Sequence, residues 1–278
     1  MIIGKHVSIA GGIAQAPGRA KAIGCNALQV FARNPRSWQG RKLPTGEGER
    51  VKAAMEKLGM EVLAVHAIYL INLASPDDKL WEKSRQAIAE DYRRAGEIGA
   101  DFLVVHPGSH HGSGLKEGVL RIGHALNGVL ESNKNETKIL LENVAGAGTA
   151  LGSNFTQIHD IIKEIAEKDR IGFCLDTCHA FVAGYDLSTN QGLEQTLREL
   201  EREIGFDYLK MLHINDSRYA LASRKDRHAH LGKGQIGQDG LARIVNHPDL
   251  RHLPFILETA SFQGRDQDVE LIISLSNH

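Results

Sequence analysis

The sequence predicts an α/β protein that folds as a closed (β/α)₈ (TIM) barrel, with a metal site at the C-terminal face of the strands. Short apolar runs alternate with longer segments of helical period about eight times along the chain. The runs are apolar throughout, which is typical of parallel strands covered on both faces. Eight such units within 278 residues favour a closed barrel over the alternative, a doubly wound open sheet.

The expected strands are the apolar, β-branched runs, at residues 2–8, 26–32, 61–66, 101–106, 138–142, 171–176, 208–213 and 254–258. Helices are expected where apolar residues recur at three- and four-residue spacing, over 77–99, 154–169 and 190–205. The first and third of these segments end on glycine, and the second begins with Asn154 as its N-cap. We find no linker, low-complexity tract or repeated motif, so residues 1–278 are expected to form one domain.

The composition of the chain limits which classes of function are expected. Hydrophobic residues make up 42% of the chain and the formal net charge is −1, so a nucleic-acid binder of this composition needs a local basic surface. No run of about 18 apolar residues is present, and the first residues lack the basic and long apolar regions of a signal peptide. Three cysteines argue against a disulfide framework. We therefore expect no membrane association and a reducing cytoplasm.

The ends of six consecutive expected strands carry side chains that can bind a metal: His66, His106, Glu142, Asp176, His213 and Glu258. In a barrel of this type the C-terminal strand ends converge on one face, where active sites lie. Three carboxylates gathered there cannot all ionise comfortably unless cations neutralise them. No cysteine ends a strand in this set, so the ligand atoms are N and O, which suit Zn²⁺, with Mn²⁺ and Fe²⁺ as alternatives.

Three more candidate ligands lie close by in the sequence. His179 follows Asp176 by three residues, in the expected loop after that strand, and Asp226 and His228 form a D-x-H pair in "SRKDRHAHLGKG". Taken alone, such a pair is equally typical of a solvated turn. Nine ligands exceed the needs of one metal and suit two or three four-coordinate sites that share a carboxylate. Clustered metals most often indicate phosphoryl chemistry.

Several motifs then carry a resemblance to a known family, from "HVSIAGG" (6–12) to "FILET" (255–259). Between these lie "FARNPRSW", "HAIYLINLASP", "VVHPGSHHG", "LLENVAGAG", "CLDTCHAFVAGYDL", "LHINDS" and "DRHAHLGKGQIG". The chain resembles endonuclease IV, the metal-dependent AP (abasic-site) endonucleases of base-excision repair. The resemblance covers essentially the whole chain and agrees with the barrel, because this family is similar to xylose isomerase in fold.

The resemblance implies three zinc ions per chain, with Mn²⁺ or Fe²⁺ as partial replacements. His66 and His106 would hold the first ion, and Glu142 would bridge it to the second as the catalytic carboxylate. The remaining implied ligands are Asp176, His213 and Glu258 for the second ion, and His179, Asp226 and His228 for the third. Cys174 and Cys178 are expected to be packing residues, His6 and His230 to be structural, and His110 and His111 to lie on a loop.

The activity implied by the resemblance is hydrolysis of the phosphodiester 5′ to an abasic site in double-stranded DNA, with trimming of blocked 3′ ends. Family precedent implies a monomer, acting in the cytoplasm at the nucleoid. Arg36 and Tyr69 match family residues that enter the duplex at the lesion. Basic groups gather in two expected loops, 33–42 and 217–230. Ile68 departs from the small or polar residue usual beside that tyrosine, which affects loop packing and DNA contact.

Two other functions remain open on the sequence. A metal-dependent sugar isomerase on the same barrel would explain the strand-end ligands with two metals, but would leave the third group without a role. A non-catalytic DNA-damage binding protein would use its zinc ions structurally, although ligand sets without cysteine argue against that. The number of bound metals, three or two, distinguishes the endonuclease from the sugar isomerase. Cleavage of abasic DNA distinguishes it from the non-catalytic binding protein.

Overall fold

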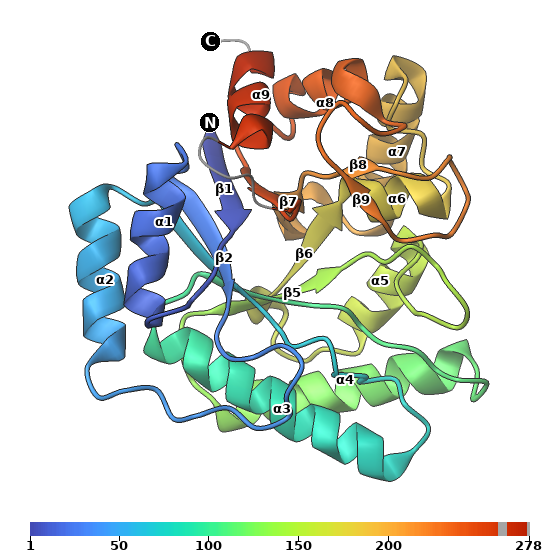
Figure 1. Ribbon diagram of the computed structural model, residues 1–278. Helices are drawn as coiled ribbons and strands as arrows, with labels where there is room; N and C mark the ends of the chain where they lie inside the picture. Colours follow the sequence, from blue (N-terminus) through green and yellow to red (C-terminus); the bar gives the residue numbers. More distant parts are fainter. Residues whose placement is uncertain (261–265, 277–278) are drawn as a thin grey trace.

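Eight parallel strands close into a barrel in the computed structural model, which describes residues 1–260 and 266–276 (Figure 1). Around the barrel the strand order is β1-β10-β7-β6-β5-β4-β3-β2, and β1 also pairs with β2. The strands are β1 (Ile2–His6), β2 (Ala27–Phe31), β3 (Val62–His66), β4 (Phe102–Val105), β5 (Lys138–Glu142), β6 (Ile171–Asp176), β7 (Leu209–His213) and β10 (Pro254–Leu257). The expected barrel is confirmed, and the open-sheet alternative is wrong.

Helices surround the barrel, and α9 lies beside β1, so that the last helix packs against the first strand (Figure 1). They are α1 (Ala16–Ala22), α2 (Glu47–Leu58), α3 (Asp78–Glu97), α4 (Leu115–Ser132), α5 (Phe155–Lys163), α6 (Thr177–Ala183), α7 (Asn190–Glu203), α8 (Gly237–Asn246) and α9 (Gln267–Leu275). Short 3₁₀ helices occur at Ile13–Gln15, Lys168–Arg170 and Phe206–Tyr208. Two short strands after β7, β8 (Asp216–Ser217) and β9 (His228–Ala229), form a separate antiparallel pair. No helix in the described part of the chain has both the length and the apolar character needed to cross a bilayer.

Several boundaries differ from the sequence prediction by one or two residues, and one helix ends much earlier than predicted. The helix expected over 154–169 begins at its predicted cap, where Asn154 accepts a hydrogen bond from the Gln157 amide, but it ends at Lys163. The Lys168 ammonium donates to the carbonyls of Ile162, Lys163 and Ile165, and so satisfies carbonyl groups that the end of the helix leaves without partners. Strands β4 and β10 end one residue before His106 and Glu258, so these two side chains follow their strands directly.

The barrel interior has an apolar floor beneath the predicted site. A separate cluster of buried side chains fills it: Ala27, Val62, Ala64, Val104, Leu140, Cys174, Met211 and Ile256. Six of these residues precede a strand-end candidate ligand by two positions, as Leu140 precedes Glu142. Because strand side chains alternate between faces, residues two apart point to the same side. The candidate ligands therefore form the layer above this floor.

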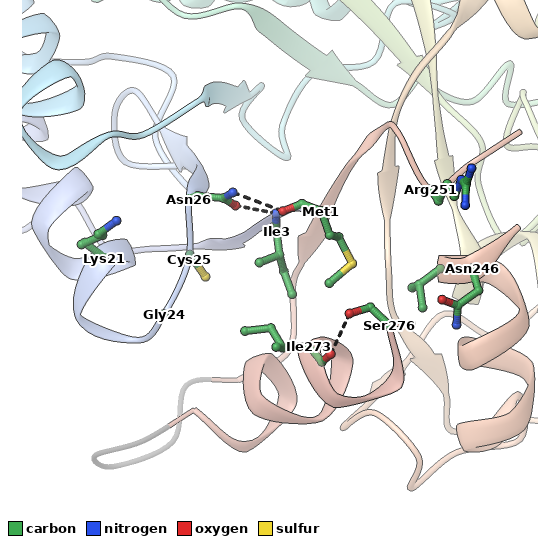
Figure 2. Close-up of a pocket in the computed structure, with 11 residues that line it drawn as sticks. Met1, Ile3, Lys21, Gly24, Cys25, Asn26, Asn246, Arg251, Ile273 and Ser276 are labelled. Atoms are coloured by element: carbon green, nitrogen blue, oxygen red, sulfur yellow. Dashed lines mark hydrogen bonds between the residues drawn. The ribbon is translucent and has the colours of Figure 1, made fainter. Parts of the chain in front are cut away.

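The opposite, N-terminal end of the barrel holds a pocket of about 730 Å³. Figure 2 shows Cys25 and Asn26 on one side of it, and Asn246 and Arg251 on the other. Cys25 and Asn26 lie just before β2, and Asn246 and Arg251 lie before β10. The pocket is therefore at the end of the barrel away from the candidate ligands. Burial raises the pKa of the Cys25 thiol to about 12, so the thiol stays protonated at neutral pH.

Gly4 is required by the closeness of the strands. It lies in β1 beside Ala27 and Ile256, and an added Cβ would approach the Ala27 carbonyl group and the Ile256 side chain at 2.6–2.7 Å. We predict that Gly4→Ala lowers the free energy of unfolding by about 1–3 kcal/mol, because overpacking forces the backbone to shift. The measurement is thermal or urea unfolding.

The matched control is Gly18→Ala in α1, where an added Cβ meets no atom within 4 Å. Alanine favours a helix over glycine by up to ~1 kcal/mol, so this variant should be as stable as the parent or more so. Equal stability of the two variants would contradict the close approach at Gly4.

Candidate metal centre

The structure brings the nine candidate ligands together at the C-terminal end of the barrel. They fall into three groups, and the ligand atoms within each group lie within 4.8 Å of one another. The groups are His66, His106 and Glu142; Glu142, Asp176, His213 and Glu258; and His179, Asp226 and His228. Glu142 belongs to the first two groups, so it joins them.

Glu142 is fully buried at the centre of these side chains. Its Oε2 lies 3.2 Å from His66 Nε2 and 3.1 Å from His106 Nε2. Its Oε1 lies 3.0 Å from His213 Nδ1 and 3.3 Å from His179 Nδ1. The two oxygens of one carboxylate thus face two different sets of imidazoles, which is the arrangement that a bridging ligand requires.

His179 lies in a helix and not in the loop that the sequence suggested. Asp176, the last residue of β6, caps the seven-residue helix α6, because its Oδ1 accepts a hydrogen bond of 2.7 Å from the His179 amide. Its other oxygen, Oδ2, accepts a hydrogen bond of 2.7 Å from the Asn215 side-chain amide and lies 3.6 Å from His228 Nε2. One aspartate therefore fixes the helix that carries His179 and also faces the third group.

The antiparallel strands β8 and β9 begin and close the segment 216–229, where the sequence suggested a loop over 217–230. His228 is the first residue of β9, and its Nε2 is a buried atom without a hydrogen-bond partner. His179 Nε2 lies 3.2 Å from Asp226 Oδ2. A buried imidazole nitrogen left unsatisfied beside two carboxylates is the arrangement expected of a metal ligand.

Hydrogen bonds fix the orientation of three candidate imidazoles. His66 Nδ1 donates to the Ala67 carbonyl at 2.7 Å, and His179 Nδ1 donates to the Asn143 carbonyl at 2.9 Å. His213 Nε2 donates to Gln29 Oε1 at 2.9 Å. In the rings of His66 and His213 the other nitrogen faces Glu142, and in the ring of His179 it faces Asp226, as is usual for histidines that bind metals.

Sequence reasoning missed the residues that hold the candidate ligands. Gln29 also donates to Glu258 Oε1 at 2.7 Å, and Asn143 binds the backbone of Asp176 through both ends of its amide. Asn215 donates to Asp176 and accepts from the Glu258 amide. Gln29 could have been found, because it is a polar residue inside an apolar strand, two positions after the inward-facing Ala27.

The electrostatics of the site suit a cation. Burial alone would raise the carboxylate pKa values, but the imidazoles of His213 and His106 hold the pKa of Glu142 well below its usual range. His179 lowers the pKa of Asp226 to about 2 against the effect of burial. Conversely, Glu142 raises the pKa of His66 although burial opposes this. Glu142 and Asp226 are therefore ionised, which is the form that binds metals.

The remaining candidate residues take structural positions. Cys174 is buried in the barrel floor, as predicted. Cys178 lies near Asp176 and His228, but its thiol donates to the Arg227 carbonyl, and burial raises its pKa to about 12. A thiol that stays protonated is a poor metal ligand.

Three more histidines hydrogen-bond to neighbouring residues. His6 Nδ1 lies 3.0 Å from Gln29, and His230 Nδ1 lies 2.8 Å from Asp268. His110 accepts from two backbone amides in the loop after β4, where His111 also lies.

Arg36 and Tyr69 lie in the loops after β2 and β3, and Tyr69 lies beside the candidate ligands. Both residues are exposed, and Tyr69 has 64% of its surface open to solvent. The Tyr69 ring packs edge-on against Phe31, with 5.0 Å between the two ring centroids. Ile68 is buried in the core, where it packs beneath the loop, and it also lines one of the two hollows at this face of the barrel. A hollow of about 320 Å³ lies over the site, bounded by Tyr69, His106 and Glu258 among others. A second, of about 290 Å³, adjoins it between the loops after β3, β4 and β5.

Comparisons with known proteins place this arrangement in context. A family model described as a xylose isomerase-like TIM barrel matches residues 17–275. The chain is 54% identical over 272 residues to a probable endonuclease 4 of Halothermothrix orenii, with 98% of each chain covered. Endonuclease IV from Thermus thermophilus is similar in structure, with a TM-score of 0.89, 36% identity and coverage of 99% of this chain and 98% of that one. A D-tagatose 3-epimerase-like protein shares the fold alone, with a TM-score of 0.74 at 18% identity, over 99% of this chain and 97% of that one.

Proposed function

The chain belongs to the endonuclease IV family and is a DNA-cleaving hydrolase of DNA repair, and on that basis we propose that it cuts duplex DNA at abasic sites with three zinc ions. Cleavage lies 5′ to the abasic site and leaves a 3′-hydroxyl and a 5′-deoxyribose phosphate. Blocked 3′ ends are a second substrate. We further propose that the enzyme is a monomer that works in the cytoplasm at the nucleoid, and that Mn²⁺ or Fe²⁺ replaces zinc in part.

The position of Glu142 is the observation that carries this proposal. Its Oε2 faces His66 and His106, whereas its Oε1 faces His213. We assign the first ion to this histidine pair and the second to Asp176, His213 and Glu258, with Glu142 shared between them. The third ion is assigned to His179, Asp226 and His228, where the unsatisfied His228 nitrogen supports it.

The protein supplies positioning and exclusion of water. When bound, the ions neutralise charge on the phosphate oxygens and activate water for attack on phosphorus. Glu142 sets the spacing of the first two groups, while Gln29 and Asn215 hold His213, Glu258 and Asp176 in place. The layer below is filled by buried apolar side chains, so the hollow over the ligands is the side from which the phosphate approaches.

Recognition of the lesion uses the hollows beside the ligands. An abasic nucleotide has no base to pair or stack, so turning it out of the duplex costs less than turning out an intact one. The 290 Å³ and 320 Å³ hollows are proposed to receive it. Tyr69, which lines both hollows, and Arg36, which is exposed in the loop after β2, are proposed to fill the space left in the stack.

Family membership decides between the alternatives from the sequence. The likeness to the D-tagatose 3-epimerase-like protein is at 18% identity and concerns the fold, whereas the endonuclease relatives reach 54%. The sugar isomerase is therefore set aside, and the non-catalytic binding protein is set aside because the family cleaves DNA.

We predict three metal ions per chain and loss of cleavage when they are removed. The measurement is metal analysis of the purified protein, with cleavage of an abasic duplex assayed before and after prolonged chelation and again after zinc is restored. His228→Ala should reduce the content to two ions, because it removes a ligand of the third group. Cys178→Ser, the control, should keep all three. A content of one ion, or full activity in the stripped protein, would exclude the proposal.

Glu142→Gln is predicted to lower turnover by several orders of magnitude, since each ~1.4 kcal/mol lost from transition-state stabilisation is tenfold in rate. The change keeps the size of the side chain and removes the charge shared by two groups. Glu47→Gln is a matched control, because Glu47 is also buried but pairs with Arg50 and the Ala14 amide away from the site. Near-normal turnover by metal-loaded Glu142→Gln would mean that Glu142 is not the bridge.

The combined change Arg36→Ala and Tyr69→Ala is predicted to weaken binding to an abasic duplex by about tenfold or more, since stacking by one aromatic side chain contributes roughly 1–3 kcal/mol. Cleavage of a small phosphodiester, which needs no distortion of DNA, should be nearly unchanged. Binding to both duplexes is measured across salt concentrations. Equal weakening on abasic and intact duplex, with a smaller salt dependence, would indicate phosphate contact alone.

A further inference from the structure

One buried carboxylate on α3 holds both of the loops that carry the exposed Arg36 and Tyr69. Asp91 is 1% exposed. Its Oδ1 accepts a hydrogen bond of 2.5 Å from Arg33 Nε, in the loop after β2. Its Oδ2 accepts one of 3.1 Å from the backbone amide of Ile68, in the loop after β3. Arg33 precedes Arg36 by three residues, and Ile68 immediately precedes Tyr69.

Arg33 extends this connection through the whole first loop. Its side chain is 3% exposed and lies inside the loop, where Nη1 donates to the carbonyls of Ser37 and Trp38. Its Nη2 donates to the Ala87 carbonyl on α3. The loop therefore folds around a guanidinium whose charge is paired with Asp91 at 2.5 Å, and Arg36 lies at the exposed turn of that loop.

A buried ion pair is an expensive way to stabilise a fold. Desolvation offsets most of its Coulomb energy, and apolar residues of similar size often stabilise as well or better. What the pair adds is directional geometry, because an arginine makes several hydrogen bonds at fixed angles. All the backbone groups that Arg33 and Asp91 bind, apart from the Ala87 carbonyl, belong to the two loops at the C-terminal face.

We propose that Asp91 is a positioning residue for DNA, which fixes Arg36 relative to Tyr69 so that both side chains enter the duplex at one lesion. This inference rests on the proposed function, because it takes those two residues as the groups that enter the stack. Asp91 itself is buried and does not touch DNA. Its removal leaves the two loops free to move independently, so the ordering of both loops is added to the cost of binding.

The next residue of α3 provides a matched control. Tyr92 is fully buried, and its hydroxyl donates to the Thr137 carbonyl at 2.7 Å and accepts from Arg170 at 2.8 Å. Thr137 immediately precedes β5, so this contact lies at the N-terminal end of the barrel. Tyr92→Phe removes a buried polar contact from the same helix without touching either loop.

The experiment measures Kd for an abasic duplex, kcat and KM for its cleavage, metal content and unfolding temperature. Asp91→Ala and Asp91→Asn are each made in the parent protein and in the double variant Arg36→Ala, Tyr69→Ala. Asp91→Asn keeps the shape of the side chain, so it replaces Asp91→Ala in the experiment should Asp91→Ala fail to fold. We expect Asp91→Ala to raise Kd and KM roughly fivefold, with kcat and metal content unchanged, and Asp91→Asn to raise them less. In the double variant without Arg36 and Tyr69 the same change should raise Kd by less than about 1.5-fold, because the effects of mutations at coupled residues are not additive.

Tyr92→Phe should lower the unfolding temperature and leave Kd unchanged. Equal effects of the Asp91 variants in both backgrounds, an unchanged Kd, or a matching effect of Tyr92→Phe would overturn the positioning role. Failure of the proposed function is seen separately, because the parent protein would then not cleave the abasic duplex at all.

Discussion

The arrangement of charge around the buried Glu142 carboxylate is the constraint on which the rest of the structure depends. One carboxylate reaches His66, His106 and His213 because β3, β4, β5 and β7 end at one level, and that level is set by the register of parallel strands. A one-residue slip of any of these strands would turn its candidate ligand out of the barrel. The site therefore uses the same hydrogen bonds that close the barrel.

Polar function and apolar stability are kept in separate layers. The floor contributed by residues such as Ala64, Leu140 and Met211 is apolar, and a second, larger core lies between the strands and the helices. Buried polar groups are costly unless they are paired. Here they are gathered in one layer, where Gln29, Asn143 and Asn215 pair those that do not face the cluster. The loops after β2 and β3 follow the same rule, since the charges of Arg33 and Asp91 are buried together.

The barrel and its ligand layer could be predicted because both follow from local periodicity. Apolar runs gave the strands, and a strand-end histidine or carboxylate faces inward when the residue two before it does. The helix that carries His179 could not be predicted, because α6 has seven residues and depends on the cap made by Asp176. Asp91 could not be found either, since its partners lie 58 and 23 residues away in the chain. Contacts of that kind leave no periodic pattern in a sequence.

The central claim is that three groups of strand-end and loop residues hold three metal ions, with Glu142 shared by the first two groups. Anomalous X-ray scattering at the zinc edge, from crystals of the zinc-loaded protein, tests it most directly because it locates each ion against its ligands. The account predicts three peaks: one beside His66 and His106, one beside Asp176, His213 and Glu258, and one beside His179, Asp226 and His228. It also predicts that the Glu142 carboxylate lies between the first two. Fewer than three peaks, or an ion held by Cys178 or His230 in place of these residues, would contradict it.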